Sequence, residues 1–218
     1  MFRVLEIHPN NPQPRLIQQA VQLLQRGEVL AAPTDSSYAL VCQLDDKNAV
    51  DTLRRIRRVD DKHLLTLLCR DLSEVSHYAR VDNRQYRLLK QATPGPFTFV
   101  LDASKEVPRR VSHASRKTIG LRVPQHLTLQ ALLEAHGSAL LATTLFQPEP
   151  DEDDDIPALP LHDVSDVTEL LDQQVAAVID SGTCPNQPTT VVDLTPMVNG
   201  GAPELIRVGA GDPALVGL

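Results

Sequence analysis

The chain has 218 residues, of which 42% are hydrophobic and 3% aromatic, and it contains no tryptophan. This composition suits one compact domain, or a domain with an appendage, whose core is aliphatic, and it argues against a general base-stacking platform for nucleic acid. The formal net charge is -7, no apolar run has membrane-spanning length, and no signal-peptide pattern opens the chain, so we expect a cytoplasmic protein.

Hydrophobic periodicity predicts a chain of alternating helices and strands. Helices are expected over 16–24, 49–58, 83–92, 127–135 and 167–171, with a short one that starts at the capping-box spacing of 71–74. Strands are expected at 29–32, 64–69, 97–101, 118–123, 139–144, 175–180, 190–194 and 205–208. Because strands follow one another directly in two places, we predict a twisted, mixed parallel and antiparallel sheet flanked by helices, in a single α/β domain over residues 1–218.

A polar run follows the strand at 29–32. Pro33 ends that strand, and Thr34, Asp35, Ser36 and Ser37 precede Tyr38. Hydroxyl and carboxylate groups of this kind hydrogen-bond well in turns. Ligands often bind where the strands of an α/β sheet end. The run is therefore either a capped loop or one side of a binding site.

Basic residues are concentrated in the middle of the chain. Residues 47–122 hold 17 of the 21 Lys and Arg residues and eight acidic residues, whereas residues 123–206 hold 14 acidic residues and no Lys or Arg. The middle segment can thus present a positive field on an acidic protein, unless the two segments meet in the fold and their charges intermix. The candidates for RNA contact are Arg54, Arg55, Arg58, Arg109, Arg110, Arg116 and Lys117, and the alternative is that these are solvated surface charges.

The sequence indicates neither a metal site nor a disulfide strongly. Cys42, Cys69 and Cys184 are odd in number and lack CxxC spacing, which fits a reducing compartment. Residues 147–157 form an acidic, proline-punctuated segment that we expect to be a flexible loop. Its carboxylates lack the spacing of an EF-hand, so we expect no tightly bound metal.

Five segments, at 33–38, 94–98, 120–124, 188–193 and 206–209, together resemble the motifs of the YrdC-like family in their order. The segments 69–74, 105–110 and 116–120 are similar to its YciO branch, and the resemblance covers nearly the whole chain. It implies a single YrdC-like domain and an L-threonylcarbamoyl-AMP synthase activity, a nucleotidyl transfer in which threonine, bicarbonate and ATP with Mg²⁺ give an intermediate for tRNA modification. It also implies a concave, positive surface that binds double-stranded RNA or tRNA.

The resemblance assigns roles to individual positions. The substrate-binding positions it implies are Thr34, Ser36, Tyr38 and Arg122. The nucleotide-binding positions it implies are Arg57, His63, Thr144, Thr189, Thr190 and Arg207, with Arg57 also the catalytic cation.

Two positions depart from the family pattern, and both lie on the nucleotide side. Val59 stands where the second cation of a Lys-x-Arg clamp is usual, and Phe146 stands where an asparagine amide is usual. A lost charge-assisted hydrogen bond of this kind is worth about 1.5–3 kcal/mol. We therefore expect a synthase that is weak or altered in substrate.

Two alternatives remain open from the sequence. One is an RNA-binding protein that keeps the basic concavity and has little catalysis. The other is a carrier or sensor for a small carboxylate or a nucleotide. No oligomeric state is implied.

Overall fold

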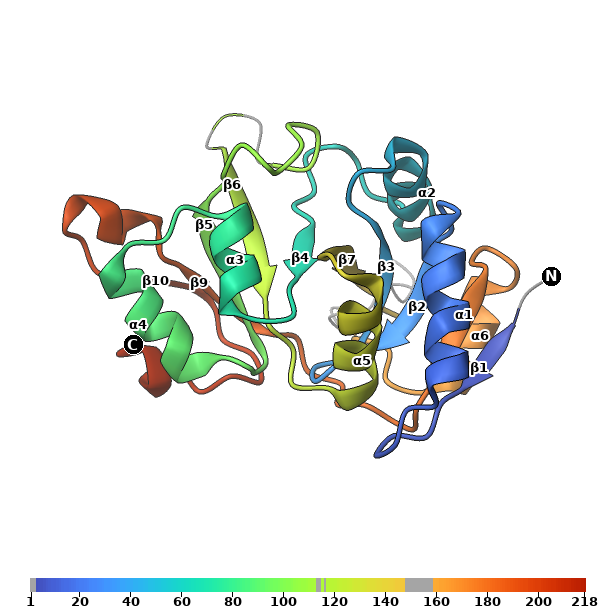
Figure 1. The fold of residues 1–218 in the computed structure, drawn as a ribbon. Helices are drawn as coiled ribbons and strands as arrows, with labels where there is room; N and C mark the ends of the chain where they lie inside the picture. Colours follow the sequence, from blue (N-terminus) through green and yellow to red (C-terminus); the bar gives the residue numbers. More distant parts are fainter. Residues whose placement is uncertain (1–2, 113–114, 116, 148–158) are drawn as a thin grey trace, which may run out of the picture.

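The computed structural model describes residues 3–112, 115, 117–147 and 159–218. Arg116 and residues 148–157 of the predicted acidic loop lie outside the described residues. The elements in chain order are β1 (Val4–Glu6), α1 (Pro14–Gln25), β2 (Leu30–Pro33), β3 (Tyr38–Gln43), α2 (Lys47–Arg57), β4 (Thr66–Leu68), α3 (Leu72–Tyr78), α4 (Asn83–Ala92), β5 (Phe97–Asp102), β6 (Thr118–Arg122), α5 (Leu127–His136), β7 (Leu140–Thr144), α6 (Val164–Leu171), β8 (Ala177–Asp180), β9 (Thr190–Asp193), the 3₁₀ helix η1 (Thr195–Asn199), β10 (Glu204–Arg207) and the 3₁₀ helix η2 (Pro213–Val216) (Figure 1).

One ten-stranded sheet runs through the molecule in the order β1-β8-β2-β3-β7-β4-β6-β5-β9-β10. The pairs β1/β8, β2/β8, β4/β6 and β5/β9 are parallel, and the remaining neighbours are antiparallel. The predicted mixed α/β sheet is therefore confirmed. Two strands, β1 and β3, were not expected from the sequence pattern.

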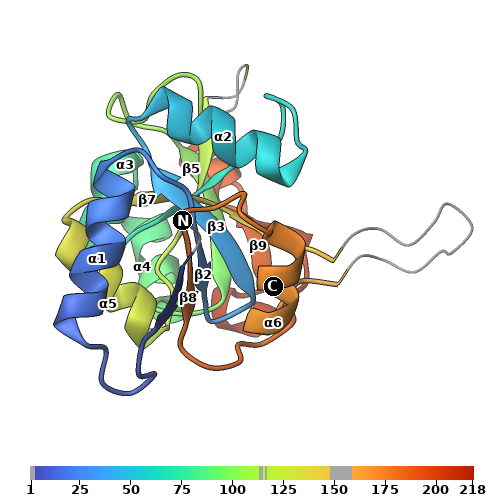
Figure 2. The same ribbon diagram turned by 90° about the vertical axis from the view of Figure 1, so that its right-hand side faces the viewer.

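The sheet separates two apolar cores, because successive residues of a strand face opposite sides. Leu40 and Leu141 belong to one core, with α2 packed on β3. Their chain neighbours Val41 and Leu140 belong to the other, where α1 and α5 pack together. Figure 2 shows α1 and α5 side by side on one side of the molecule, with α2 and α6 away from them.

A local hydrogen-bond motif explains why α4 begins where it does. Asp82 caps α4 by accepting hydrogen bonds from the backbone N–H groups of Arg84 and Gln85, and the Gln85 Oε1 atom accepts one from the backbone N–H of Asp82. This reciprocal arrangement is a capping box. The helix has the bounds that the sequence pattern predicts.

The three cysteines are buried and form no disulfide. Among the residues that the structure describes, no helix has both the length and the apolar composition to cross a bilayer. Within the same described ranges, no group of three His, Cys, Asp or Glu side chains is arranged to hold a metal ion.

Candidate functional site

A cavity of about 250 Å³ lies on one face of the middle of the sheet; we call it the central cavity. Its floor is rich in threonines on separate strands, because alternate residues of each strand face it. Thr66, Gly120 and Ala142 are register partners on β4, β6 and β7 and line it together. A Cβ on Gly120 would lie 3.2 Å from both the Thr66 Oγ1 and the Thr98 Cγ2 atoms, so glycine keeps this floor open.

Cationic and imidazole side chains from separate segments surround this floor. His63 precedes β4, Arg122 ends β6 and Arg207 ends β10, and all three line the cavity. Arg207 donates from Nε and Nη2 to the backbone oxygen of Thr189 at 3.2 and 3.0 Å. Among its described lining residues the cavity has no carboxylate. The arrangement therefore favours an anionic ligand.

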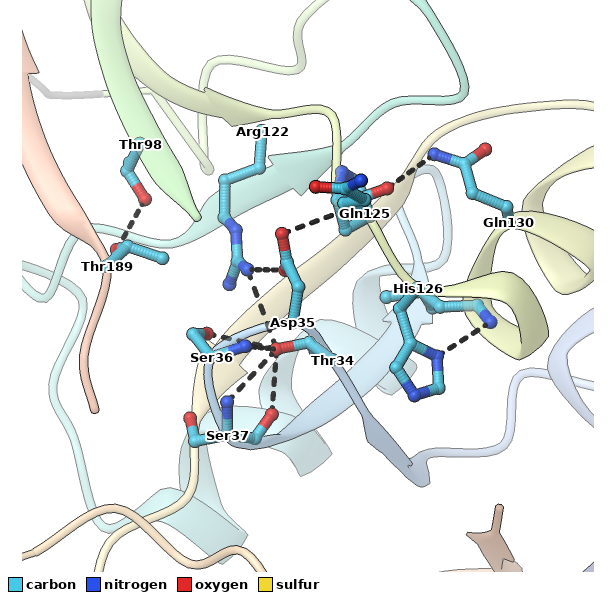
Figure 3. A network of polar contacts seen from close by, with 12 residues as sticks. Thr34, Asp35, Ser36, Ser37, Thr98, Arg122, Gln125, His126, Gln130 and Thr189 are labelled. Atoms are coloured by element: carbon cyan, nitrogen blue, oxygen red, sulfur yellow. Dashed lines mark hydrogen bonds and ion pairs between the residues drawn. The ribbon is translucent and has the colours of Figure 1, made fainter. Parts of the chain in front are cut away.

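Arg122 and Asp35 form a buried ion pair beside the cavity (Figure 3). The Arg122 Nη2 atom bonds the Asp35 Oδ1 atom, while the Asp35 Oδ2 atom accepts from the backbone N–H of Gln125 at 2.9 Å. The Nε atom of Arg122 is buried and has no hydrogen-bond partner among the described residues. A ligand oxygen in the cavity would satisfy this donor.

The polar run 34–37 folds into a tight turn that carries Asp35. The Thr34 Oγ1 atom accepts from the backbone N–H groups of Ser36 and Ser37 and donates to the backbone oxygen of Ser37 at 2.8 Å. The Ser36 Oγ atom lies 3.0 Å from the Thr34 Oγ1 atom, and the Arg122 Nη2 atom lies 3.5 Å from the same hydroxyl oxygen. The hydroxyls of Thr34 and Ser36 thus shape the turn beside the cavity and are not among the groups that line it.

Tyr38 has a different position from the one expected. Its side chain is fully buried in the core that holds Leu40, and its hydroxyl donates to the backbone oxygen of Ile179 at 2.9 Å. Burial raises the pKa of this phenol. The resemblance implies that Tyr38 lines a threonine pocket; in the structure the ring joins β3 to β8 and is not among the residues that line the central cavity.

Arg57 is held next to the cavity by two of its lining residues. Its Nε atom donates to the backbone oxygen of Thr144 at 2.9 Å. Its guanidinium lies over the ring of Phe146, with 4.9 Å between the guanidinium carbon and the ring centroid. The position at which the family pattern has an amide therefore carries a ring that stacks on the expected catalytic cation.

His63 joins this side of the cavity through its imidazole. The Nε2 atom lies 3.3 Å from the Thr143 Oγ1 atom. Burial lowers the pKa of His63, and the nearby charges of Arg57 and Arg54 lower it further. The imidazole is therefore neutral at pH 7, and Arg57 supplies the positive charge here.

The basic cluster of α2 divides into inner and outer members. Arg54, expected either to contact RNA or to be a solvated surface charge, is buried, and its Nη1 atom donates to the backbone oxygens of Asp60 and His63. Arg55 and Arg58 are exposed. Arg58 ends the helix in the left-handed conformation, with a φ of 56°. The sequence pattern placed it inside the helix.

A second basic surface lies where β5 ends and the antiparallel strand β6 begins. Arg80, Lys105, Arg109 and Lys117 line a hollow of about 550 Å³, which we call the basic hollow. All four side chains are exposed. Arg110 points elsewhere, because its Nη2 atom donates to the backbone oxygen of Leu44 at 3.1 Å.

Of the two threonines predicted to bind nucleotide on β9 and just before it, only Thr189 lines the central cavity. Its Oγ1 atom lies 2.8 Å from the Thr98 Oγ1 atom. Thr190 is buried, where its hydroxyl donates to the backbone oxygen of Gly211 and accepts from the backbone N–H of Gly209. A Cβ on Gly209 would lie 2.2 Å from the backbone oxygen of Pro188, so only glycine allows this approach. Thr190 thus holds the C-terminal segment against β9.

The sequence pattern did not assign Asp35 or Thr98 to the site. Asp35 was visible as the acid inside the hydroxyl run, but its arginine partner lies 87 residues further along the chain. Thr98 and Thr189 meet only because β5 and β9 are neighbours in the sheet.

Comparison with known proteins gives several similarities. A model of the Sua5/YciO/YrdC family, which carries the description "Telomere recombination", matches residues 22–209. Over 212 residues the chain is 46% identical to the uncharacterized protein YciO of Escherichia coli, covering 97% of this chain and 98% of that protein. The crystal structure of E. coli YciO superposes with a TM-score of 0.90 at 45% identity, over 99% of this chain and 100% of that one.

Proteins with an assigned activity are more distant. The threonylcarbamoyl-AMP synthase of Vibrio vulnificus is 33% identical over 132 residues, which cover 59% of this chain and 70% of that protein. The crystal structure of P. abyssi Sua5 complexed with L-threonine has a TM-score of 0.82 at 22% identity, over 100% of this chain and 61% of that one. At 22% identity this similarity shows a common fold and nothing more.

Proposed function

Because the chain belongs to the Sua5/YciO/YrdC family, we propose that its central cavity binds L-threonine and ATP and joins them slowly as threonylcarbamoyl-AMP. The observation that carries the proposal is the meeting of Arg57, His63, Arg122 and Arg207 around one threonine floor that lacks carboxylates among its described lining residues. Similarity to a threonylcarbamoyl-AMP synthase and to a Sua5 structure with bound threonine supports the choice of ligands.

The reaction has two steps. The threonine amine adds to bicarbonate with loss of water and gives a carbamate. A carbamate oxygen then attacks the α-phosphorus of ATP, the bond to the β-phosphate oxygen breaks, and pyrophosphate leaves. Negative charge on the phosphates rises as pyrophosphate departs, so fixed cations beside it stabilise the transition state.

The residues of the cavity suit separate parts of this reaction. Arg122 meets the threonine carboxylate through its buried, unpartnered Nε donor, while the Asp35 carboxylate holds the guanidinium in place. Arg57 and Arg207 contact phosphates, and Thr189 and Thr144 offer hydroxyls. Thr190 takes no part, because both of its hydroxyl contacts are internal.

Magnesium is expected with ATP, but the described lining of the cavity has no carboxylate that would hold it. Mg²⁺ is commonly bound through substrate phosphates and few protein ligands. The residues present therefore do not form a resident magnesium site, and the ion belongs to the nucleotide substrate.

Release of pyrophosphate tests the proposal. We expect release that requires threonine, bicarbonate and ATP together, and loss of that release in Arg57→Gln. Arg26→Gln, on the exposed end of α1, is the matched control and keeps the release. Failure to detect any threonine-dependent release at high enzyme concentration overturns the proposal. In that case, calorimetry with threonine, AMP and ATP tests whether the protein is instead a carrier or sensor of one of these molecules.

A second candidate function is binding of structured RNA, including tRNA. The basic hollow supports it, because four exposed cations meet there and, of these, only Lys105 has an acidic partner within 4.0 Å among the described side chains, at 3.9 Å. Cations that contact phosphates make binding fall steeply with salt. We expect Arg109→Glu with Lys117→Glu to weaken binding to a tRNA or an RNA duplex and to flatten its salt dependence. Arg15→Glu with Arg26→Glu is the control, and equal loss in both double variants contradicts a role for the hollow.

A further inference from the structure

A second, separate cavity lies where β4 and β6 end. It has a volume of about 660 Å³ and shares no lining residue with the central cavity; we call it the strand-end crevice. Its volume lies in the range of about 300–1,000 Å³ that is usual for small-molecule sites.

The topology explains why a crevice forms at this point. Strands β4 and β6 are parallel neighbours. The chain leaves β4 into α3, whose Val75 joins one core, and leaves β6 into α5, whose Leu132 joins the other core. The two connections thus depart to opposite faces of the sheet. In open α/β sheets, ligands bind outside the carboxyl ends of strands at such a switch point.

The lining of the crevice is largely apolar. The side chains of Leu72, Pro94, Val123, Pro124 and Leu127 contribute to it. Leu127 is exposed, with 60% of its surface accessible. A ligand with a branched apolar body would cover this leucine and gain the free energy of removing apolar surface from water.

Arg70 lines the crevice and carries a hydrogen-bond donor that no described residue accepts. Its Nη2 atom lies 3.2 Å from the Glu74 Oε1 atom, and its backbone N–H donates to the Glu74 Oε2 atom at 2.7 Å. The Asp71 Oδ1 atom accepts from the backbone N–H of Glu74. Both Glu74 carboxylate oxygens and the Asp71 Oδ1 atom thus face protein donors, whereas the buried Arg70 Nε atom has no partner among the described residues.

His126 supplies a second donor. Its Nδ1 atom accepts from the backbone N–H of Leu129 at 3.3 Å, which places the ring proton on Nε2 (Figure 3). Gln130 uses its Nε2 atom on the backbone oxygen of Pro124 at 2.7 Å. The polar groups of the crevice that remain for a ligand therefore include a guanidinium N–H and an imidazole N–H.

From these observations we propose that the strand-end crevice is a second binding site, for a small molecule with a branched apolar body and one carboxylate. The carboxylate accepts from Arg70 and His126, and the body packs on Leu72, Val123 and Leu127. The site is distinct from the central cavity and does not depend on the function proposed for it.

The two cavities are joined by one stretch of chain. The backbone oxygen of Arg122 accepts from the backbone N–H of Cys69 at 2.7 Å, and the backbone N–H of Gln125 donates to the Asp35 Oδ2 atom at 2.9 Å. A molecule that contacts Val123 thus lies next to the ion pair of the central cavity.

An amide-resolved NMR titration with isovalerate tests the proposal. We expect saturable shifts of the Leu72, Val123 and Leu127 backbone amides at concentrations up to about 10 mM, and at least tenfold weaker effects from the neutral isoamyl alcohol, since one charge-assisted hydrogen bond is worth at least that ratio. Equal binding of the alcohol overturns carboxylate recognition. Shifts confined to Thr98 and Arg207, or no saturable shift, overturn the site.

Two variants locate the ligand. Leu127→Asp removes the apolar contact and adds a repelling carboxylate at the first position of α5, where an acid suits the helix. We expect it to abolish the isovalerate shifts, and Arg70→Gln to weaken binding at least about tenfold. Leu215→Asp, also at an exposed leucine, is the matched control. Wild-type affinity in a folded Leu127→Asp protein contradicts the proposal.

Discussion

The guanidinium of Arg57 lies over the ring of Phe146, with 4.9 Å from the guanidinium carbon to the ring centroid. The same arginine donates to the backbone oxygen of Thr144 at 2.9 Å. Phe146 and Thr144 thus fix the orientation of the arginine that we propose as a phosphate contact.

Replacing Phe146 by leucine removes the ring and keeps apolar volume. A cation–π contact is worth about 0.5–2 kcal/mol, so we expect ATP binding to weaken between about twofold and thirtyfold. Calorimetry measures this, with threonine affinity on the same protein as the internal control. Unchanged ATP affinity would mean that the stacked geometry does not matter for the nucleotide.

Asp35→Asn leaves the buried Arg122 without its countercharge. Breaking a buried ion pair by removing one partner costs about 3–5 kcal/mol, so the free energy of unfolding falls by about 3 kcal/mol or more. Urea unfolding measures this change. In the double variant Asp35→Leu with Arg122→Met no charge is left uncompensated, and we expect it to be more stable than Asp35→Asn. A stability of Asp35→Asn equal to that of the wild type would contradict the burial of the pair.

Thr34→Val keeps the shape of the side chain and removes its hydroxyl. The backbone N–H groups of Ser36 and Ser37 lose their acceptor, which costs about 2–4 kcal/mol of unfolding free energy. Thr34→Ser keeps the hydroxyl and is the control, with an expected loss below about 1 kcal/mol. Equal stability of the two variants in urea would show that the turn does not need the hydroxyl.

His63 makes stability depend on pH. Burial lowers its pKa below the ordinary value of 6.5, so the unfolded chain binds more protons than the folded protein on acidification, and stability falls as pH drops through and below about 6.5. His126 contributes in the same direction, because burial lowers its pKa as well. We expect His63→Gln to lose less stability than the wild type between about pH 7.5 and about pH 5.5. Identical pH profiles would contradict a neutral, buried His63.

The helices and the buried strands were predictable because their apolar spacing is local. Helix α4 has the expected bounds. Strand β3 was overlooked because Tyr38–Gln43 directly follows the polar run and reads as its continuation. Strand β1 is three residues long with one buried side chain, which gives no clear period.

The candidate site was only partly predictable, for physical reasons. The sequence singled out Arg57, His63, Arg122, Thr144, Thr189 and Arg207, and the structure brings them to one cavity or its edge. It could not show that Arg54 turns inward to carbonyls, or that Tyr38 serves the core, because both depend on contacts made by the folded chain. The pairing of Phe146 with Arg57 depends on such contacts as well.

Identification of the product distinguishes synthesis of threonylcarbamoyl-AMP from binding of its substrates alone. The protein is incubated with threonine, ATP, magnesium and carbon-13-labelled bicarbonate. The products are separated, and their masses are measured by mass spectrometry. We expect an AMP adduct that contains threonine and one labelled carbon, formed more slowly than about one turnover per second. Absence of any threonine-containing adduct, at enzyme concentrations equal to those of the substrate, would contradict it.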